Sequence, residues 1–175
     1  MIAPLSLSNV FTVMIAVACL TTIAAQSRGE VTKLWRLAVP ASLAAVQALI
    51  LLASVFEASF VNDAEWLIAA IAGSVVGRAR GWAMPIAVDQ TRSLIRLRRS
   101  LDGQIAAVGL VICAFVDFTG AALDEAIIPC EHTAAATALF AGYIACRSLA
   151  IAVRASRVPN LELIDPQRMK TTSPV

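Results

Sequence analysis

The chain has 175 residues, of which 59% are hydrophobic and 15% are charged. A soluble domain of this length cannot bury so much apolar surface, so the composition excludes an ordinary globular protein and indicates a polytopic membrane protein. The net charge of +2 excludes a strongly basic body that binds nucleic acid.

The first two apolar segments follow each other closely. Residues 5–25 carry no charge and are about as long as one membrane crossing, for which roughly 20 residues suffice. No basic segment precedes them, and Arg28 and Arg36 follow, so we expect a retained first helix and not a signal peptide. The second expected span covers residues 35–57, with Pro40 in its first turns, where a missing backbone donor costs least.

Three further spans complete the expected architecture. They cover residues 65–81, 104–123 and 132–153. Residues 82–103 form a cytoplasmic loop between the third and fourth spans, and residues 155–175 form a tail that we expect to be loosely ordered. Residues 1–154 are therefore expected to make a single all-α membrane domain of five transmembrane helices.

The charged residues are sorted between the two sides of this arrangement. If the loops after the first and third spans lie on the same side as the tail, that side holds all 14 basic and five acidic residues, a net charge of +9. The other side holds the remaining seven acidic residues, a net charge of −7. Because basic loops stay in the cytoplasm, the pattern predicts an outside N-terminus, an inside C-terminus and residence in the bacterial inner membrane.

Small residues recur at every fourth position of the third span, at Ala69, Gly73, Gly77 and Gly81. Such rows let two helix backbones approach closely in lipid. The row serves either a homodimer or other membrane-protein partner, or a neighbouring helix of the same chain. We expect the neighbouring helix, because a five-helix bundle needs such contacts internally.

The loop after the third span has two structural interpretations. Apolar and basic residues alternate from Ile95 to Arg98, after a polar turn at residues 89–93, which is typical of a β-hairpin. The segment also fits an amphipathic helix on the inner leaflet, because Leu94 and Leu101 then share one helical face. Both alternatives stay open at this point.

Six arginines in and near this loop are candidates for contact with anionic lipid or with a partner: Arg78, Arg80, Arg92, Arg96, Arg98 and Arg99. The simpler interpretation, which we favour, is that they only fix the topology.

The same region carries a family pattern. An apolar helix ends in Gly77, Arg80 and Gly81, and a turn and an arginine-rich stretch follow, with Val88, Asp89, Arg92, Leu94, Arg96, Arg99 and Ser100. This pattern resembles the CcdC-like group of small, largely uncharacterised bacterial membrane proteins. The resemblance implies a cytoplasmic hairpin and so favours strands. The name associates the group with cytochrome c maturation, but the resemblance implies no assigned chemistry.

Asp117 is the candidate ionisable group inside the membrane. It lies 13 residues beyond Gln104, about 20 Å along a helix and so in the outer part of the hydrocarbon core. An ionisable group there marks a pathway, a partner or a proton site, unless the helix ends early enough for Asp117 to reach water. We expect Arg147 to extend toward the cytoplasmic surface, with Asp102 or Gln104 as a nearer partner than Asp117.

The cysteines suggest two further possibilities. Cys19, Cys113 and Cys146 lie at similar depths, where two facing thiols could exchange electrons, but we expect them to pack as small apolar side chains. Cys130 and His132 supply only two metal ligands, so we expect a helix start there and no metal site.

The sequence has no nucleotide-binding loop, nucleophile elbow, HExxH motif or catalytic triad spacing, and nothing in it indicates a cofactor. We therefore favour a non-enzymatic accessory, assembly or sensory membrane component, although an enzyme is not excluded. The alternatives are a small transporter or ion-coupled carrier that uses Asp117, and a thiol-redox or metal-handling helper.

Overall fold

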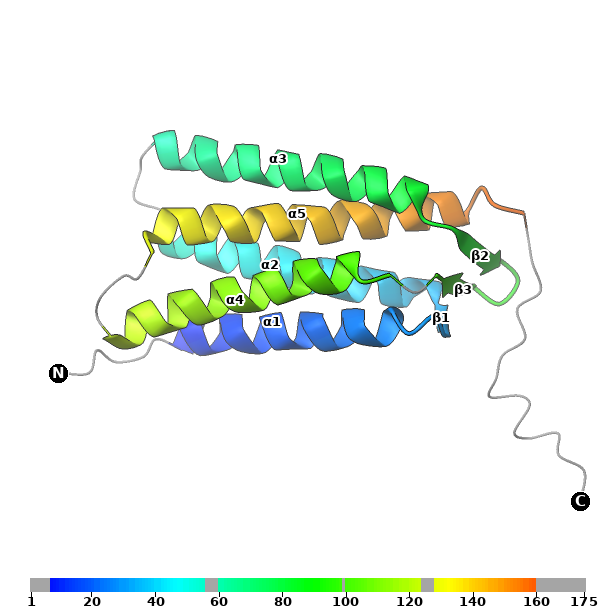
Figure 1. Ribbon diagram of the computed structural model, residues 1–175, viewed down its shortest axis with the longest axis horizontal. Helices are drawn as coiled ribbons and strands as arrows, with labels where there is room; N and C mark the ends of the chain where they lie inside the picture. The colour runs from blue at the N-terminus through cyan, green and yellow to red at the C-terminus, as the bar shows by residue number, and fades with distance from the viewer. Residues whose placement is uncertain (1–6, 56–59, 99, 124–127, 160–175) are drawn as a thin grey trace, which may run out of the picture.

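The computed structural model describes residues 7–55, 60–98, 100–123 and 128–159. Within these residues the chain forms five α-helices that run roughly side by side, and a small three-stranded sheet at one end of the bundle (Figure 1). We call this end the sheet end and the opposite end the far end. Arg99 and most of the predicted tail, residues 160–175, lie outside the described residues.

The predicted number of helices is confirmed for the part of the chain that the structure describes. In chain order the elements are α1 (Leu7–Gln26), β1 (Val31–Lys33), the 3₁₀ helix η1 (Leu34–Leu37), α2 (Ala38–Val55), α3 (Phe60–Ala83), β2 (Ile86–Asp89), β3 (Leu94–Leu97), α4 (Asp102–Leu123) and α5 (Cys130–Ala155). The largest difference is in α3, which begins five residues before the predicted span.

Four helices are long and apolar enough to cross a membrane, and they span Leu7–Gln26, Leu34–Ala53, Asp102–Leu123 and Cys130–Ala155. A helix suits this environment because it satisfies its backbone hydrogen bonds internally. The helix α3 is not among these four, and its first turns carry Asp63 and Glu65. It has 24 residues, which corresponds to about 36 Å at the α-helical rise.

The last helix, α5, is central to the bundle. It packs against α2, α3 and α4, and α1 packs against α2 and α4. The buried core between the helices consists mainly of small side chains with a few larger aliphatic ones: Cys19, Ile23, Ala44, Ala48, Ala106, Ala107, Leu110, Ala141 and Ile144. Small side chains allow the helix axes to approach closely.

The glycine row of α3 lies against α5. A Cβ atom added at Gly73 would collide with the backbone of Leu139, and one added at Gly77 would collide with the backbone of Tyr143. At Gly81 the added atom would lie 2.7 Å from the Cβ of Ala150. The three glycines therefore pack against α5 of the same chain, and Ala69 lies half-buried one turn before them.

The loop after α3 forms strands. β2 and β3 pair as an antiparallel hairpin, from Ile86 opposite Leu97 to Asp89 opposite Leu94. β1, from the loop after α1, adds to the other edge of β3, so the strand order is β1-β3-β2. The amphipathic-helix interpretation of this loop is therefore wrong, because the backbone of β3 pairs with strands on both edges, and Leu94, Ile95 and Leu97 are buried.

The sheet packs firmly on the end of the bundle. A second buried core joins β2 and β3 to η1, the end of α3 and the last turns of α5: Leu37, Met84, Val88, Ile95, Leu97, Ile151 and Ala155. The predicted alternation is confirmed, since Ile95 and Leu97 are buried whereas Arg96 and Arg98 are exposed. The sheet and α5 therefore share one core.

The hairpin turn is held by Asp89, whose side chain is buried. Its Oδ1 accepts hydrogen bonds from the Thr91 hydroxyl at 2.8 Å and from the backbone N–H of Arg92 at 3.2 Å. Ser93 completes the turn with φ of 53°, in the left-handed region. The Gln90 amide donates to the carbonyl of Val158 at 3.0 Å, which ties the turn to the chain after α5.

Candidate functional site

Three helices bring charged side chains together at the sheet end. Arg80 lies in the last turns of α3, Asp102 begins α4, and Arg147 lies in the second half of α5. Tyr143 precedes Arg147 by four residues, so the two share one face of α5. The glycines of α3 let it approach this face, and Arg80 thereby comes within reach of Asp102.

Asp102 is the centre of the cluster. Its Oδ2 accepts a hydrogen bond from the Tyr143 hydroxyl at 2.8 Å and lies 3.4 Å from Nε of Arg147. Nε of Arg80 lies 3.7 Å from the same oxygen. The side chains of Asp102 and Arg147 are only 17% and 11% exposed, whereas that of Arg80 is 62% exposed. Asp102 and Arg147 thus form a mostly buried ion pair.

This geometry confirms that Asp102 is the nearer partner of Arg147. It also corrects the expectation that Arg147 extends to the surface, because the guanidinium stays inside the cluster, with Nη2 3.5 Å from Sδ of Met84. The second residue suggested as its partner, Gln104, instead donates a hydrogen bond from its side-chain amide to the Ser27 hydroxyl.

Two buried polar atoms of the cluster make no hydrogen bond to any described residue. They are Oδ1 of Asp102 and Nε of Arg147. Buried polar groups in native proteins are nearly always hydrogen-bonded, so such atoms call for an explanation. The described protein groups therefore leave hydrogen-bonding capacity in the cluster unused.

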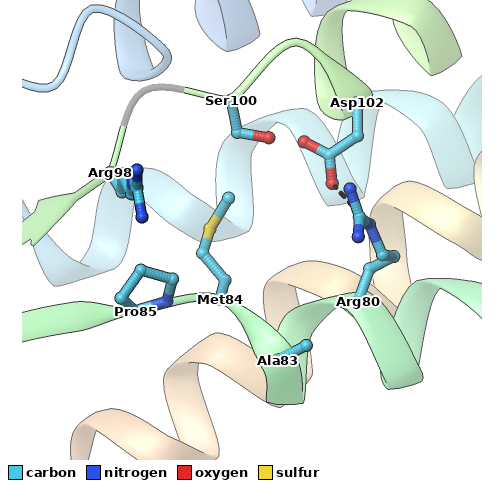
Figure 2. Close-up of a pocket in the computed structure, with 7 residues that line it drawn as sticks. All are labelled: Arg80, Ala83, Met84, Pro85, Arg98, Ser100 and Asp102. Carbon is cyan, nitrogen blue, oxygen red and sulfur yellow. Dashed lines mark ion pairs between the residues drawn. The ribbon is translucent and has the colours of Figure 1, made fainter.

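A cavity of about 150 Å³ adjoins the cluster between the end of α3 and the start of α4. Its walls are formed by Arg80, Ala83, Met84, Pro85, Arg98, Ser100 and Asp102 (Figure 2). In Figure 2, Arg98 and Arg80 lie at opposite ends of the cavity, Ser100 and Asp102 lie along one edge, and Pro85 and Met84 lie along the other. Polar side chains thus occupy three sides and apolar ones the fourth.

The charge of this region is positive. Arg80, Arg98 and Arg147 contribute three guanidinium groups, and Asp102 contributes one carboxylate, which is already paired. Arg98 has no ion-pair partner among the residues that the structure describes. The arrangement can therefore hold an anion.

The six arginines predicted as contact residues separate into two groups. The structure brings Arg80 and Arg98 to the cavity, whereas Arg78, Arg92 and Arg96 are exposed and do not line it. Arg99 lies outside the described residues.

The sequence analysis did not single out Arg154. Its Nη1 donates to the carbonyl of Gly81 at 3.0 Å and to that of Met84, and so satisfies carbonyls at the end of α3. The sequence feature that could have indicated it is its position at the end of the fifth expected span. A basic side chain in the last turn of a helix interacts favourably with the helix dipole.

Asp117 lies far from this cluster along α4. It is 15 residues beyond Asp102, about 22 Å at the α-helical rise. Its side chain is half-buried, and it forms no ion pair with a described residue. The structure therefore does not bring Asp117 and Arg147 together.

The cysteines are free thiols. Cys19 is buried, and its Sγ donates to the carbonyl of Pro40 at 3.5 Å, while Cys113 is buried and Cys146 is partly buried. At the far end, Nδ1 of His132 lies 3.0 Å from Oε1 of Glu65, and Cys130 is exposed. Within the described residues no three His, Cys, Asp or Glu side chains gather as a metal site would require.

Comparisons with protein-family models, with curated proteins and with solved structures find no match for this chain. Its function must therefore be argued from its own residues.

Proposed function

We propose that this chain is a non-enzymatic accessory, assembly or sensory component of the bacterial inner membrane, and that its sheet end is the contact surface. One observation carries the proposal. Two separate basic loops of the chain, one after α1 and one after α3, join in a single sheet that is packed onto α5. A loop that serves only to fix topology needs no such structure. The resemblance to the CcdC-like group is part of this proposal.

The proposed topology has five spans, an outside N-terminus and a cytoplasmic sheet end. The length of α3 and its packing along α5 support a fifth crossing. The distribution of charge supports the orientation: Asp63, Glu65 and Glu131 lie at the far end, and the basic loops lie at the sheet end.

Exposed tryptophans support the same placement of the sheet end. Trp35 and Trp82 are exposed there, and the guanidinium groups of Arg36 and Arg157 lie 5.9 and 6.0 Å from their ring centroids. Amphipathic aromatic rings prefer the level of the lipid headgroups, and arginines beside them extend toward water. This combination is typical of a boundary between membrane and water.

A photo-crosslinking experiment in native membranes tests the contact surface. A photoreactive residue in place of the exposed Arg96 should give one protein adduct of defined mass. The matched control is Val75, which is exposed on α3 away from the sheet and should give lipid adducts only. A photoreactive residue in place of the exposed Arg92 provides a second test site. If neither substituted position gives a protein adduct, the proposal is wrong.

Asp117 favours a second candidate, an ion-coupled carrier. The observation is its half-buried position deep in α4 without an ion-pair partner among the described residues. A carrier that uses it should lose proton flux in proteoliposomes when Asp117 is changed to Asn, and the exposed Asp63→Asn should not affect the flux. An unchanged flux in the Asp117 variant excludes this candidate.

A further inference from the structure

We propose that the cavity between α3 and α4 binds a phosphate group, with Arg80 and Arg98 as its cationic walls and the Ser100 hydroxyl as a third donor. The apolar edge formed by Met84 and Pro85 would face the carbon atoms that carry the phosphate. This places a ligand in a cavity of the proposed contact surface, and so deepens the proposed function.

The charges around the cavity favour an anion. Asp102 is the only acidic side chain among the residues that line it. Its charge is already compensated by Arg147 at 3.4 Å, and the Tyr143 hydroxyl donates a hydrogen bond to it at 2.8 Å. Arg80 lies farther from Asp102, at 3.7 Å, and is mostly exposed. Arg98 makes no ion pair with a described residue, so both guanidinium groups retain donors for a ligand.

The donors suit phosphate in geometry as well as charge. A guanidinium group offers several N–H donors in a planar fork, which matches the oxygen atoms of a phosphate. The two groups lie at opposite ends of the cavity, with that of Arg80 directed at Asp102, and the Ser100 side chain lies between them on the side of Asp102 (Figure 2). Three donors that line one hollow make a better anion site than single arginines on a surface.

The size of the cavity agrees with this ligand. Its volume of about 150 Å³ is well above the roughly 10–15 Å³ of such space that a single water molecule needs, so it has room for a group larger than water. A second hollow of about 10 Å³, whose lining includes Arg98, Ser100 and Arg147, has room for about one water molecule. Arg98 and Ser100 line both spaces, so a water in the small hollow would connect the ligand site to the Asp102 cluster.

The position of the cavity favours one source of the phosphate. α3 ends at Ala83 and α4 begins at Asp102. The cavity between them therefore lies at the sheet end of the bundle, next to the exposed Trp82. In the proposed topology this is the level of the inner-leaflet headgroups, where the phosphodiester of a phospholipid is available. Free phosphate offers the same chemistry from the water side.

Binding is tested on the purified, delipidated protein in uncharged detergent. Native mass spectrometry would count bound phosphatidylglycerol, with diacylglycerol as the matched lipid that lacks phosphate. When either lipid is added, wild type should bind one molecule of phosphatidylglycerol and no diacylglycerol. Arg98→Gln should weaken binding about tenfold or more, because a charge-assisted hydrogen bond is lost. Arg96→Gln, which removes the same charge from the exposed face of β3, should change it less than about twofold.

Three results would overturn the proposal: no retained phospholipid, equal retention of diacylglycerol, or equal weakening by the Arg98 and Arg96 variants. Ser100→Ala should weaken binding in the same direction, and unchanged thermal stability of each variant excludes a folding defect. Displacement of the lipid by inorganic phosphate would identify free phosphate as a competent source, and binding without displacement would identify the lipid alone. Because this assay uses no partner protein, it can fail or succeed independently of the crosslinking test.

Discussion

At the scale of single residues, Asp102 organises the sheet end of the molecule. It starts α4, pairs with Arg147 of α5, and accepts a hydrogen bond from Tyr143. A buried charge is costly unless it is paired, so each member of this group depends on the others. The same carboxylate also forms part of the cavity wall.

Replacing Asp102 should therefore be far more damaging than replacing its exposed partner. Asp102→Ala leaves the guanidinium of Arg147 buried without its carboxylate, and we expect a loss of about 3–5 kcal/mol in the free energy of unfolding. Arg80→Gln removes a mostly exposed partner and should cost about 0–1 kcal/mol. Unfolding in a denaturing detergent, followed by tryptophan fluorescence, measures both variants.

A double substitution checks that the cost comes from the unpaired charge. Asp102→Leu combined with Arg147→Met replaces the ion pair by apolar side chains and should recover most of the lost stability. Equal losses for Asp102→Ala and Arg80→Gln would contradict a buried ion pair at this position.

Part of this site could be predicted from the sequence. Counting residues along the helices placed Arg147 closer to Asp102 than to Asp117, because the rise of a helix is fixed. Tyr143 was not singled out, and Ser100 was named only as part of the family pattern, because their roles depend on which helices become neighbours. The spacing of four residues between Tyr143 and Arg147 was a usable signal, but a shared face becomes informative only once its partner is known.

At the scale of elements, the contact between α3 and α5 depends on the absence of side chains. Gly77 faces the backbone of Tyr143, and a backbone cannot move aside as a flexible side chain can. Gly77→Val should therefore lower the free energy of unfolding by about 1–3 kcal/mol or more. Val76→Leu adds volume on an exposed face of the same helix and is the matched control.

Thermal unfolding in detergent distinguishes the two variants. We expect a clearly lowered midpoint for Gly77→Val and an unchanged midpoint for Val76→Leu. If the two midpoints agree, α3 does not pack on α5 through its glycine row.

The hairpin depends on one buried carboxylate. Asp89→Ala removes the acceptor for the Thr91 hydroxyl and the Arg92 N–H, and we expect a loss of about 1–3 kcal/mol in the local stability of the turn. Trypsin should then cleave after Arg92 faster than in wild type. Asp89→Asn keeps an acceptor oxygen and should remain close to wild type, and equal cleavage of all three proteins would show that Asp89 does not hold the turn.

The sequence predicted some elements better than others. The alternation around Ile95 indicated β3, and the polar residues after Val88 indicated the turn. β1 has only three residues, and Val31–Lys33 becomes a strand only because β3 offers a free edge, which no local pattern shows. The start of α3 was placed too late because Asp63 and Glu65 lower its hydropathy, although acidic residues favour the first turns of a helix.

At the scale of the whole molecule, the chain order explains why the sheet forms. Each loop at the sheet end connects a helix that arrives there to one that departs, so β1 and the β2–β3 hairpin emerge next to each other (Figure 1). The number of helices could be read from hydropathy. The central position of α5 could not, because it depends on complementary surfaces distributed over four helices.

The central claim is that this basic sheet end faces the cytoplasm and the far end faces outside. A membrane-impermeant maleimide applied to intact spheroplasts measures it directly. The exposed native Cys130 marks the far end, and Ser93→Cys, with Cys130 replaced by Ser, marks the exposed turn of the sheet. The account predicts labelling of Cys130 in intact spheroplasts and labelling at position 93 only after permeabilisation. Labelling of both positions from the same side would contradict it.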